Sequence, residues 1–230
     1  MSIRLLVAVA AAFFALPALA DTIAIIGTGD VGKALGPAFA KQGHTIVYGS
    51  RNPDRGKVRD LVEMSGDGAS ATTPAEAAAG ADIVVLAVPG LMVEEITLGL
   101  GDLSDKIIID PTNPLQRSLN RLEHGVDTSN AQIIQAAAPD AHVVKAFNTL
   151  NWKTMVDPSS AGGPVSIPLA GDSGKAKKKV AELVTGMGLE PIDVGSVKDA
   201  RWVEGMLILW INNRYGSMRD SFDFHLRQTN

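Results

Sequence analysis

The chain has 230 residues, of which 46% are hydrophobic and 20% are charged, a composition that excludes a disordered chain and fits one globular domain or a domain with a smaller lobe. Its net charge of −4 argues against the broad basic surface that nucleic acid or an anionic membrane requires. The absence of cysteine excludes disulfides and cysteine-based metal sites, and because the four histidines are not clustered at ligand spacings we expect no metal.

The first element in chain order is an apolar segment, "MSIRLLVAVAAAFFALPALA". One basic residue, Arg4, precedes an unbroken apolar run, and Ala18 and Ala20 put small residues at the −3 and −1 positions of a cleavage site. We therefore predict that residues 1–20 are a secretory signal cleaved after Ala20, and that the protein is secreted or periplasmic. The alternative is an uncleaved membrane anchor, for which the run is short. No later stretch is apolar enough to span a bilayer, so we expect no stable membrane span after cleavage.

Residues 21–150 alternate apolar strands with helices. A helix with apolar residues at Val31, Leu35 and Phe39 follows the first strand, and Thr73 is expected to cap another. Such alternation favours a doubly wound parallel sheet of the Rossmann type, covered on both sides. The expected strands span residues 22–26, 45–48, 81–89, 105–114 and 141–149, with helical segments at 73–81 and 130–138.

Beyond residue 150 the pattern changes, and a soft boundary is expected within 151–163, where Asp-Pro and Gly-Gly cluster. Short strands at 165–171 and 189–195 bracket a lysine-rich helix at 173–187, and a long apolar helix follows. We predict a small C-terminal α/β lobe over 151–230. In its last helix Trp202, Met206 and Trp210 form an apolar face. The face has two interpretations: packing, in the core or in a homodimer, and a wall for a flat aromatic acceptor.

The turn Gly27-x-Gly29-x-x-Gly32 follows the first strand and opens the first helix. In dinucleotide-binding units the first glycine permits the tight turn, the second lets backbone approach the pyrophosphate, and the third lets helix and strand pack closely. The helix N-terminus offers free N–H groups to the phosphates. Asp30 is unexpected there, since a carboxylate repels phosphate, and we expect it to cap the helix and point away.

The second strand ends in Ser50-Arg51, where units specific for NAD carry a carboxylate for the ribose hydroxyls. A hydroxyl and a guanidinium can instead bind a 2′-phosphate, and Arg55 and Lys57 lie just downstream as further cations. The pattern therefore predicts NADP(H) as the cofactor.

The motifs "IAIIGTGDVGKALGPAFAKQGHTIVYGSRNP", "VVLAVP", "DPTNPL" and "VVKAFNT" resemble, in this order, those of the coenzyme F420-dependent NADP oxidoreductases. That family is itself similar to the reductase domain of STEAP metalloreductases and to the nucleotide-binding domain of pyrroline-5-carboxylate reductases. The resemblance implies that the pyrophosphate lies against Gly27, Thr28, Gly29, Asp30 and Val31, and the 2′-phosphate against Ser50, Arg51 and Asn52. It further implies that Ala87, Val88 and Pro89 line the nicotinamide ribose, and that Ala146, Phe147 and Asn148 lie near the nicotinamide.

Asn113 follows an apolar strand, and because ligands in doubly wound sheets lie beyond the strand ends, it either borders the nicotinamide pocket or caps a rigid connection between prolines. No acid–base pair is evident, which suits hydride transfer, since the cofactor carries the reactivity. We therefore expect an NADP(H)-dependent oxidoreductase with a small-molecule redox acceptor, a flavin or a deazaflavin such as F420. The alternatives are a reductase of small imines or carbonyls, with His124 or His142 as proton donor, and an exported NADP-binding module without turnover.

Overall fold

The computed structural model describes residues 20–116, 121–122, 125–215, 222, 224–227 and 229. The predicted signal, apart from Ala20, lies outside the described residues, as does His124. Among the residues that the structure describes, no helix combines the length and the apolar character needed to cross a membrane.

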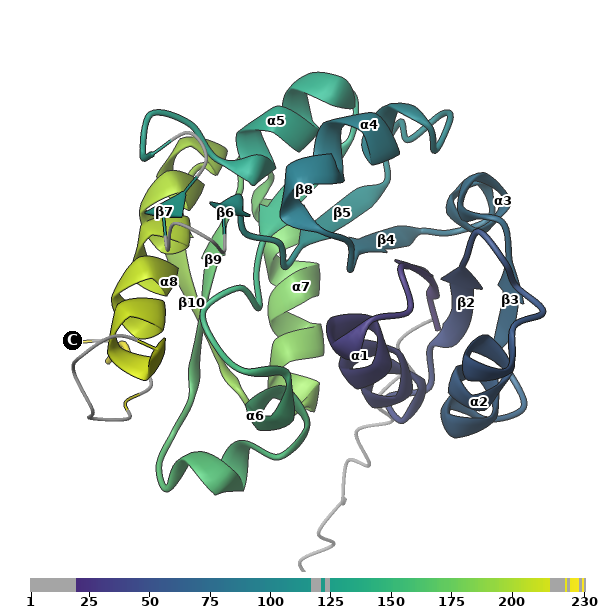
Figure 1. Cartoon of the computed structure of the whole chain (residues 1–230), viewed down its shortest axis with the longest axis horizontal. Coiled ribbons are helices and arrows are strands. Elements are labelled where there is room, and N and C mark those ends of the chain that lie inside the picture. The colour runs from purple at the N-terminus through teal and green to yellow at the C-terminus, as the bar shows by residue number, and fades with distance from the viewer. Residues whose placement is uncertain are drawn as a thin grey trace, which may run out of the picture.

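Eight strands form one sheet in the order β10-β9-β8-β5-β4-β1-β2-β3 (Figure 1). The six strands from β8 to β3 are parallel, which confirms the predicted Rossmann-type α/β fold. Beyond them β9 pairs antiparallel with β8 and parallel with β10, so these two strands extend the same sheet. The eight strands are β1 (Thr22–Ile26), β2 (Thr45–Gly49), β3 (Ser70–Thr72), β4 (Ile83–Leu86), β5 (Ile107–Asp110), β8 (His142–Lys145), β9 (Ser166–Ala170) and β10 (Glu190–Gly195).

Helices cover both faces of this sheet. In Figure 1, α4 and α5 lie above the sheet, while α1, α2, α6 and α7 lie below it. The cause is the strand pattern, because successive side chains point to opposite faces and nearly all of them are apolar. The helices are α1 (Asp30–Ala40), α2 (Gly56–Ser65), α3 (Pro74–Ala79), α4 (Val93–Leu98), α5 (Asn130–Ala137), α6 (Trp152–Val156), α7 (Gly174–Gly186) and α8 (Ala200–Tyr215). The described part of the chain also contains a short separate pair of strands, β6 (Leu115–Gln116) and β7 (Arg121–Leu122), and three 3-10 turns, η1 (Gly90–Met92), η2 (Pro158–Ala161) and η3 (Val197–Asp199).

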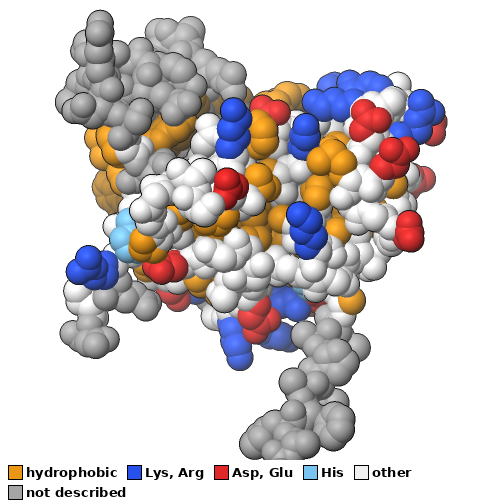
Figure 2. All heavy atoms as spheres, turned by 90° about the horizontal axis from the view of Figure 1, so that it is seen from below, with side chains coloured by type: hydrophobic (Ala, Val, Ile, Leu, Met, Phe, Trp, Pro, Cys, Tyr) orange, Lys and Arg blue, Asp and Glu red, His pale blue; other side chains and the backbone are white. Residues whose placement is uncertain are grey.

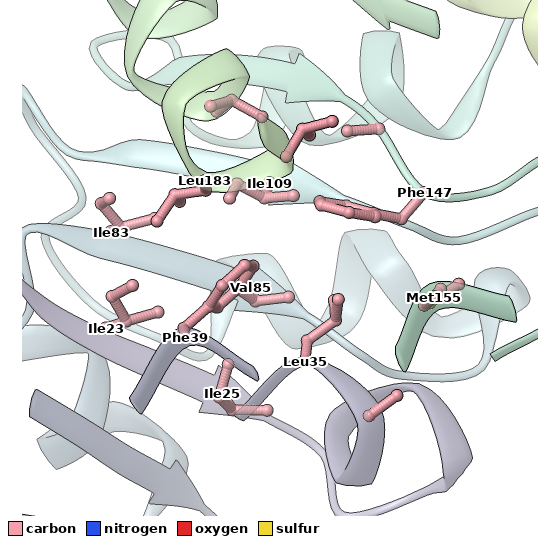
Figure 3. Close-up of a cluster of buried hydrophobic side chains, with 14 of the residues drawn as sticks. Ile23, Ile25, Leu35, Phe39, Ile83, Val85, Ile109, Phe147, Met155 and Leu183 are labelled. Carbon is pink, nitrogen blue, oxygen red and sulfur yellow. The ribbon is translucent and has the colours of Figure 1, made fainter. Parts of the chain in front are cut away.

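Each face of the sheet has its own buried cluster. Ile23 and Ile25 of β1 pack with α1, α2, α6 and α7, whereas Ala24 and Ile26 pack with α3, α4 and α5. Figure 3 shows the first cluster, in which the Phe147 ring meets Phe39 edge to face at a centroid distance of 6.2 Å. The alternation of side chains along β1 thus determines which residues of this strand pack in each of the two helical layers.

The predicted Thr73 cap is confirmed at residue level. The Thr73 side chain accepts from the backbone N–H of Glu76, whose carboxylate accepts in return from the Thr73 N–H, so α3 begins with a capping box. The last predicted helix is α8, but Trp202 is 54% exposed and Leu209 is 60% exposed, so its apolar side chains are only partly in the core. The predicted boundary near residue 150 falls between β8 and α6 and stays a prediction.

Candidate functional site

The strand register brings the predicted site residues to one edge of the sheet. Ile26 of β1 pairs with Gly49 of β2 and Leu86 of β4, and Asp110 of β5 pairs with Lys145 of β8. The residues that follow these strands therefore leave the sheet side by side. The strand order reverses between β1 and β4, and in doubly wound sheets this reversal opens the crevice in which a dinucleotide lies.

The glycine turn has the geometry of a phosphate-binding loop. Gly27 has φ +109°, and a Cβ there would stand 2.2 Å from the Ala87 carbonyl oxygen. A Cβ on Gly32 would stand 2.3 Å from the Gly27 carbonyl oxygen, so helix and turn are packed as closely as glycine allows. In contrast, a Cβ on Gly29 would meet no atom within 4 Å. The turn is therefore tight on its protein side and open in front of the α1 N-terminus, which fits a pyrophosphate.

The residues next to this turn divide between solvent and core. The N-cap of α1 is Gly29, with no side-chain cap, and Asp30 is the first helical residue and exposed. The expectation that Asp30 caps the helix is therefore wrong, because the glycine already holds the extended N-cap conformation. Val31, the next residue, is partly buried and packs against the core.

The loop after β2 is exposed and basic. The Ser50 hydroxyl accepts from the Asn52 backbone N–H at 3.2 Å, which folds the loop back, while the side chains of Arg51 and Asn52 are exposed. Arg55, the N-cap of α2, reaches back to the glycine turn, and its guanidinium donates to the Thr28 hydroxyl at 3.5 Å. In Figure 2 Lys and Arg side chains gather at the end of the molecule where β2, α2 and β3 lie in Figure 1. The loop thus offers cations beside the phosphate turn.

The loops after β4, β5 and β8 meet on the other side of the reversal. Ala87 and Val88 are half-buried and Pro89 is exposed, while a Cβ on the next residue, Gly90, would stand 1.9 Å from the Asn113 carbonyl oxygen. Asn113 and Asn148 exchange hydrogen bonds: the Asn113 side chain donates to the Asn148 carbonyl at 3.2 Å, and the Asn148 side chain donates to Asn113 Oδ1 at 3.0 Å. Asn113 therefore joins two site loops.

Phe147 is one of the three residues predicted to lie near the nicotinamide. It is 1% exposed and its ring lies in the core beside Phe39, as Figure 3 shows. Its backbone has φ +65°, the left-handed region that residues other than glycine rarely adopt. This conformation turns the chain sharply between Ala146 and Asn148, both of which are buried. That residues 146–148 lie near the nicotinamide stays a prediction.

Beneath these loops lies a buried ionic cluster that the sequence patterns did not indicate as a site. The Lys145 ammonium donates to Asp110 Oδ2 at 2.9 Å and to Glu204 Oε1 of α8 at 2.7 Å, and it also contacts the Thr112 carbonyl oxygen. All three charged side chains are 0% exposed. The one available signal was a lysine inside the apolar strand "HVVKAF", since lysine is almost never fully buried unless it is paired.

One ammonium must balance two carboxylates in this cluster. Burial raises the pKa of the Glu204 carboxyl to about 7, with Lys145 opposing the shift and Asp110 adding to it. Burial disfavours the charged form of Lys145, but the attraction of Asp110 and Glu204 outweighs it and raises the pKa of the ammonium. Among the described residues, Glu204 Oε2 and Asn148 Oδ1 have no hydrogen-bond partner although both are buried. Glu204 is therefore the carboxyl of this cluster whose pKa is shifted towards neutral pH.

His142 does not lie at this edge. It begins β8 and pairs in register with Ile107, at the amino end of β5. Its position, a strand's length from the glycine turn, does not suit a proton donor at the site.

Comparisons with known proteins agree with the observed fold. Residues 22–114 match the model of the family described as NADP oxidoreductase, coenzyme F420-dependent. The F420-dependent NADP reductase of Methanothermobacter thermautotrophicus is 30% identical over 207 residues, which cover 83% of this chain and 88% of that protein. A crystal structure of a candidate F420-dependent NADP reductase from Arthrobacter sp. FB24 superposes with a TM-score of 0.79 at 31% identity, covering 90% of this chain and 100% of the other.

The metalloreductase STEAP3 of Rattus norvegicus is 32% identical over 193 residues, or 83% of this chain. The chain spans 37% of the length of that metalloreductase. The similarity thus concerns one part of a longer protein.

Proposed function

Because the chain belongs to the family of coenzyme F420-dependent NADP oxidoreductases, we propose that it is an NADP(H)-dependent oxidoreductase that passes hydride to a planar acceptor, F420 or a flavin. The observation that carries the proposal is the open space in front of Gly29, at the N-terminus of α1, flanked by a loop with exposed arginines. An anion is favoured there by the helix dipole and free N–H groups.

The site residues divide the work along the crevice. Ser50, Arg51 and Asn52 would hold the adenosine 2′-phosphate, and the backbone of the Gly27–Gly29 turn, with Arg55 beside it, would hold the pyrophosphate. The nicotinamide half would then lie over the loops after β4 and β5, on the far side of the strand reversal. When bound, NADPH supplies the hydride. The chain contributes orientation and exclusion of water, and no side-chain acid or base is needed for that step.

Cofactor choice can be tested by changing Arg51→Ala. Loss of one charge-assisted contact should weaken NADPH by about 1.5–3 kcal/mol, which is roughly a 10- to 150-fold rise in Kd. NADH, which lacks the 2′-phosphate, should bind as it does to the wild type. Arg59→Ala provides the matched control, since Arg59 is an equally exposed arginine further along α2. Equal weakening of both cofactors by Arg51→Ala would contradict the assignment of the 2′-phosphate.

The acceptor is tested by turnover. NADPH is incubated with the protein and F420, FMN, a ferric chelate or pyrroline carboxylate, and NADPH oxidation is followed by its absorbance. Oxidation with F420 or FMN supports the proposal, and oxidation with pyrroline carboxylate alone would replace it by imine reduction. Tight binding of NADPH without turnover on any acceptor would favour an exported binding module.

Two further expectations belong to the same proposal. Export with cleavage after Ala20 would place the protein outside the cytoplasm. A homodimer through α8 would cover the exposed Trp202 and Leu209 side chains. The first is tested by the N-terminal sequence of the exported protein, and the second by its mass in solution.

A further inference from the structure

The buried Lys145 cluster joins the segments that form the nicotinamide half of the proposed site. The ammonium contacts the residue at the end of β5 and the carbonyl of Thr112 in the loop that follows. It also binds Glu204 of α8, and the Glu204 carboxylate accepts from the Asn130 backbone N–H at 2.9 Å. One charged group thus connects β5, β8, α5 and α8.

Asn130 carries the connection to the loop after β4. Its side chain donates to the Gly90 carbonyl at 2.9 Å and to the Thr112 hydroxyl at 2.7 Å. That hydroxyl in turn donates to Asp110 at 2.6 Å, which closes the network onto the Lys145 partner. The loops after β4 and β5 are therefore held to the same ionic centre.

The turn after β8 is held from two sides. Asn148 donates to Asn113 Oδ1 at 3.0 Å and to the Val203 carbonyl of α8 at 3.1 Å. Between Lys145 and Asn148 stands Phe147 with its positive φ, a conformation that persists only where surrounding contacts over-determine it. The network supplies those contacts on one side, and the core packing of the Phe147 ring supplies them on the other.

We infer that Lys145, together with Asp110 and Glu204, positions the loops after β4, β5 and β8 to receive the nicotinamide half of the cofactor. The inference rests on the proposed function, because the position of the nicotinamide follows from it. A buried ion pair is weak evidence for a stabilising role, since apolar residues of similar volume often fill such a place at no cost. A hydrogen-bonded network that joins several segments nevertheless restricts how they can be arranged relative to one another, although Glu204 Oε2 and Asn148 Oδ1 have no partner in it. Lys145 acts through other groups and is therefore a positioning residue.

The test compares two probes that share the adenosine half of the cofactor. NADPH occupies both halves of the site, whereas 2′,5′-ADP occupies only the half formed by the loop after β2 and the glycine turn. Glu204→Gln keeps the shape of the side chain and removes its charge, so binding is measured at about pH 8, where the folded carboxyl is ionised. Thr112→Val keeps the shape and removes the hydroxyl. Lys145→Met is avoided because it would leave two buried carboxylates without a counter-ion. Asp21→Asn is the control, since Asp21 forms a lysine–carboxylate pair of similar length, 2.6 Å to Lys179, at the opposite edge of the sheet.

Both network variants should raise the Kd of NADPH about tenfold and leave the Kd of 2′,5′-ADP within about twofold of the wild type. A small displacement of the loops weakens binding only of a ligand that contacts those loops, and 2′,5′-ADP does not reach them. The control should change neither value. Equal weakening of both probes, as from general loss of stability, or no weakening of NADPH, would overturn the inference while the proposed function stands. A wild-type protein that binds neither probe would overturn the proposed function, and the inference with it.

Discussion

The open space in front of Gly29 predicts that a substitution at this residue weakens cofactor binding without lowering the stability of the fold. Gly29 is the N-cap of α1 with φ −80°, a conformation that alanine adopts readily, and a Cβ there would meet no atom within 4 Å. Gly29→Ala should therefore be nearly neutral for folding. Alanine is a poorer N-cap than glycine, at a cost of up to about 1 kcal/mol, and the reduced freedom of the unfolded chain offsets about 0.4–1 kcal/mol of it.

The same methyl group should interfere with the cofactor. It would stand where the backbone is expected to approach the pyrophosphate, and inserting one methyl into a close contact costs about 1–3 kcal/mol. We expect the Kd of NADPH to rise roughly 5- to 150-fold. The measurement is isothermal titration with NADPH, paired with thermal unfolding of the protein without cofactor.

Two glycines serve as controls. Gly32→Ala should lower the melting temperature by several degrees, because its Cβ would stand 2.3 Å from the Gly27 carbonyl oxygen, a backbone atom that cannot move aside cheaply. Gly174→Ala, at the first position of α7 with no atom within 4 Å of its Cβ, should change neither stability nor binding. If Gly29→Ala binds NADPH as the wild type does, the pyrophosphate does not lie against this turn. If it unfolds as easily as Gly32→Ala, the reasoning from the open space is wrong.

Three further predictions follow from other contacts. Arg55→Ala should weaken NADPH binding less than Arg51→Ala does, but it should also weaken NADH binding, because Arg55 contacts Thr28 beside the pyrophosphate that both cofactors carry. An effect confined to NADPH would assign Arg55 to the 2′-phosphate instead. The second prediction concerns Glu204: between pH 4.5 and pH 7 the free energy of unfolding, measured by urea titration, should fall by about 2–3 kcal/mol more in the wild type than in Glu204→Gln. The reason is that the folded carboxyl keeps its proton to about pH 7, while the unfolded one releases it near its ordinary pKa of 4.5. Parallel pH profiles of the two proteins would show that Glu204 is ionised throughout. A chain starting at Asp21 should melt at the same temperature as the full-length protein, whereas a chain starting at Thr22 should melt at a lower temperature. The reason is that the Asp21 N–H donates to His44 Nδ1 at 3.1 Å and the Asp21 carboxylate pairs with Lys179 at 2.6 Å. Identical melting of the two truncated chains would contradict a structural role for Asp21.

Much of the fold could be predicted from short segments of the sequence. Apolar runs of strand length, the Thr73 cap and the glycine spacing each act within a few residues, so the physical cause is visible in the sequence itself. Helix α2 and strand β3 carried no such signal, because α2 buries only Val58 and Leu61 among charged residues and β3 has three residues. The position of Ser50 and Arg51 directly after their strand was likewise predictable, and their contact with the adenosine end of the cofactor stays a prediction.

The segments proposed to receive the nicotinamide are brought together only by the tertiary structure. Lys145 lies 35 residues from Asp110 and 59 from Glu204, and no local pattern shows which carboxylates a buried ammonium will meet. The same holds for the Phe147 ring, which packs against Phe39 from a distant part of the chain, and for the positive φ of its backbone. Local periodicity and turn chemistry therefore determined the layers of the fold and the glycine turn. Contacts between distant segments decided which charges meet beneath the loops proposed for the nicotinamide, because the pairing of buried groups depends on which parts of the chain the fold brings together.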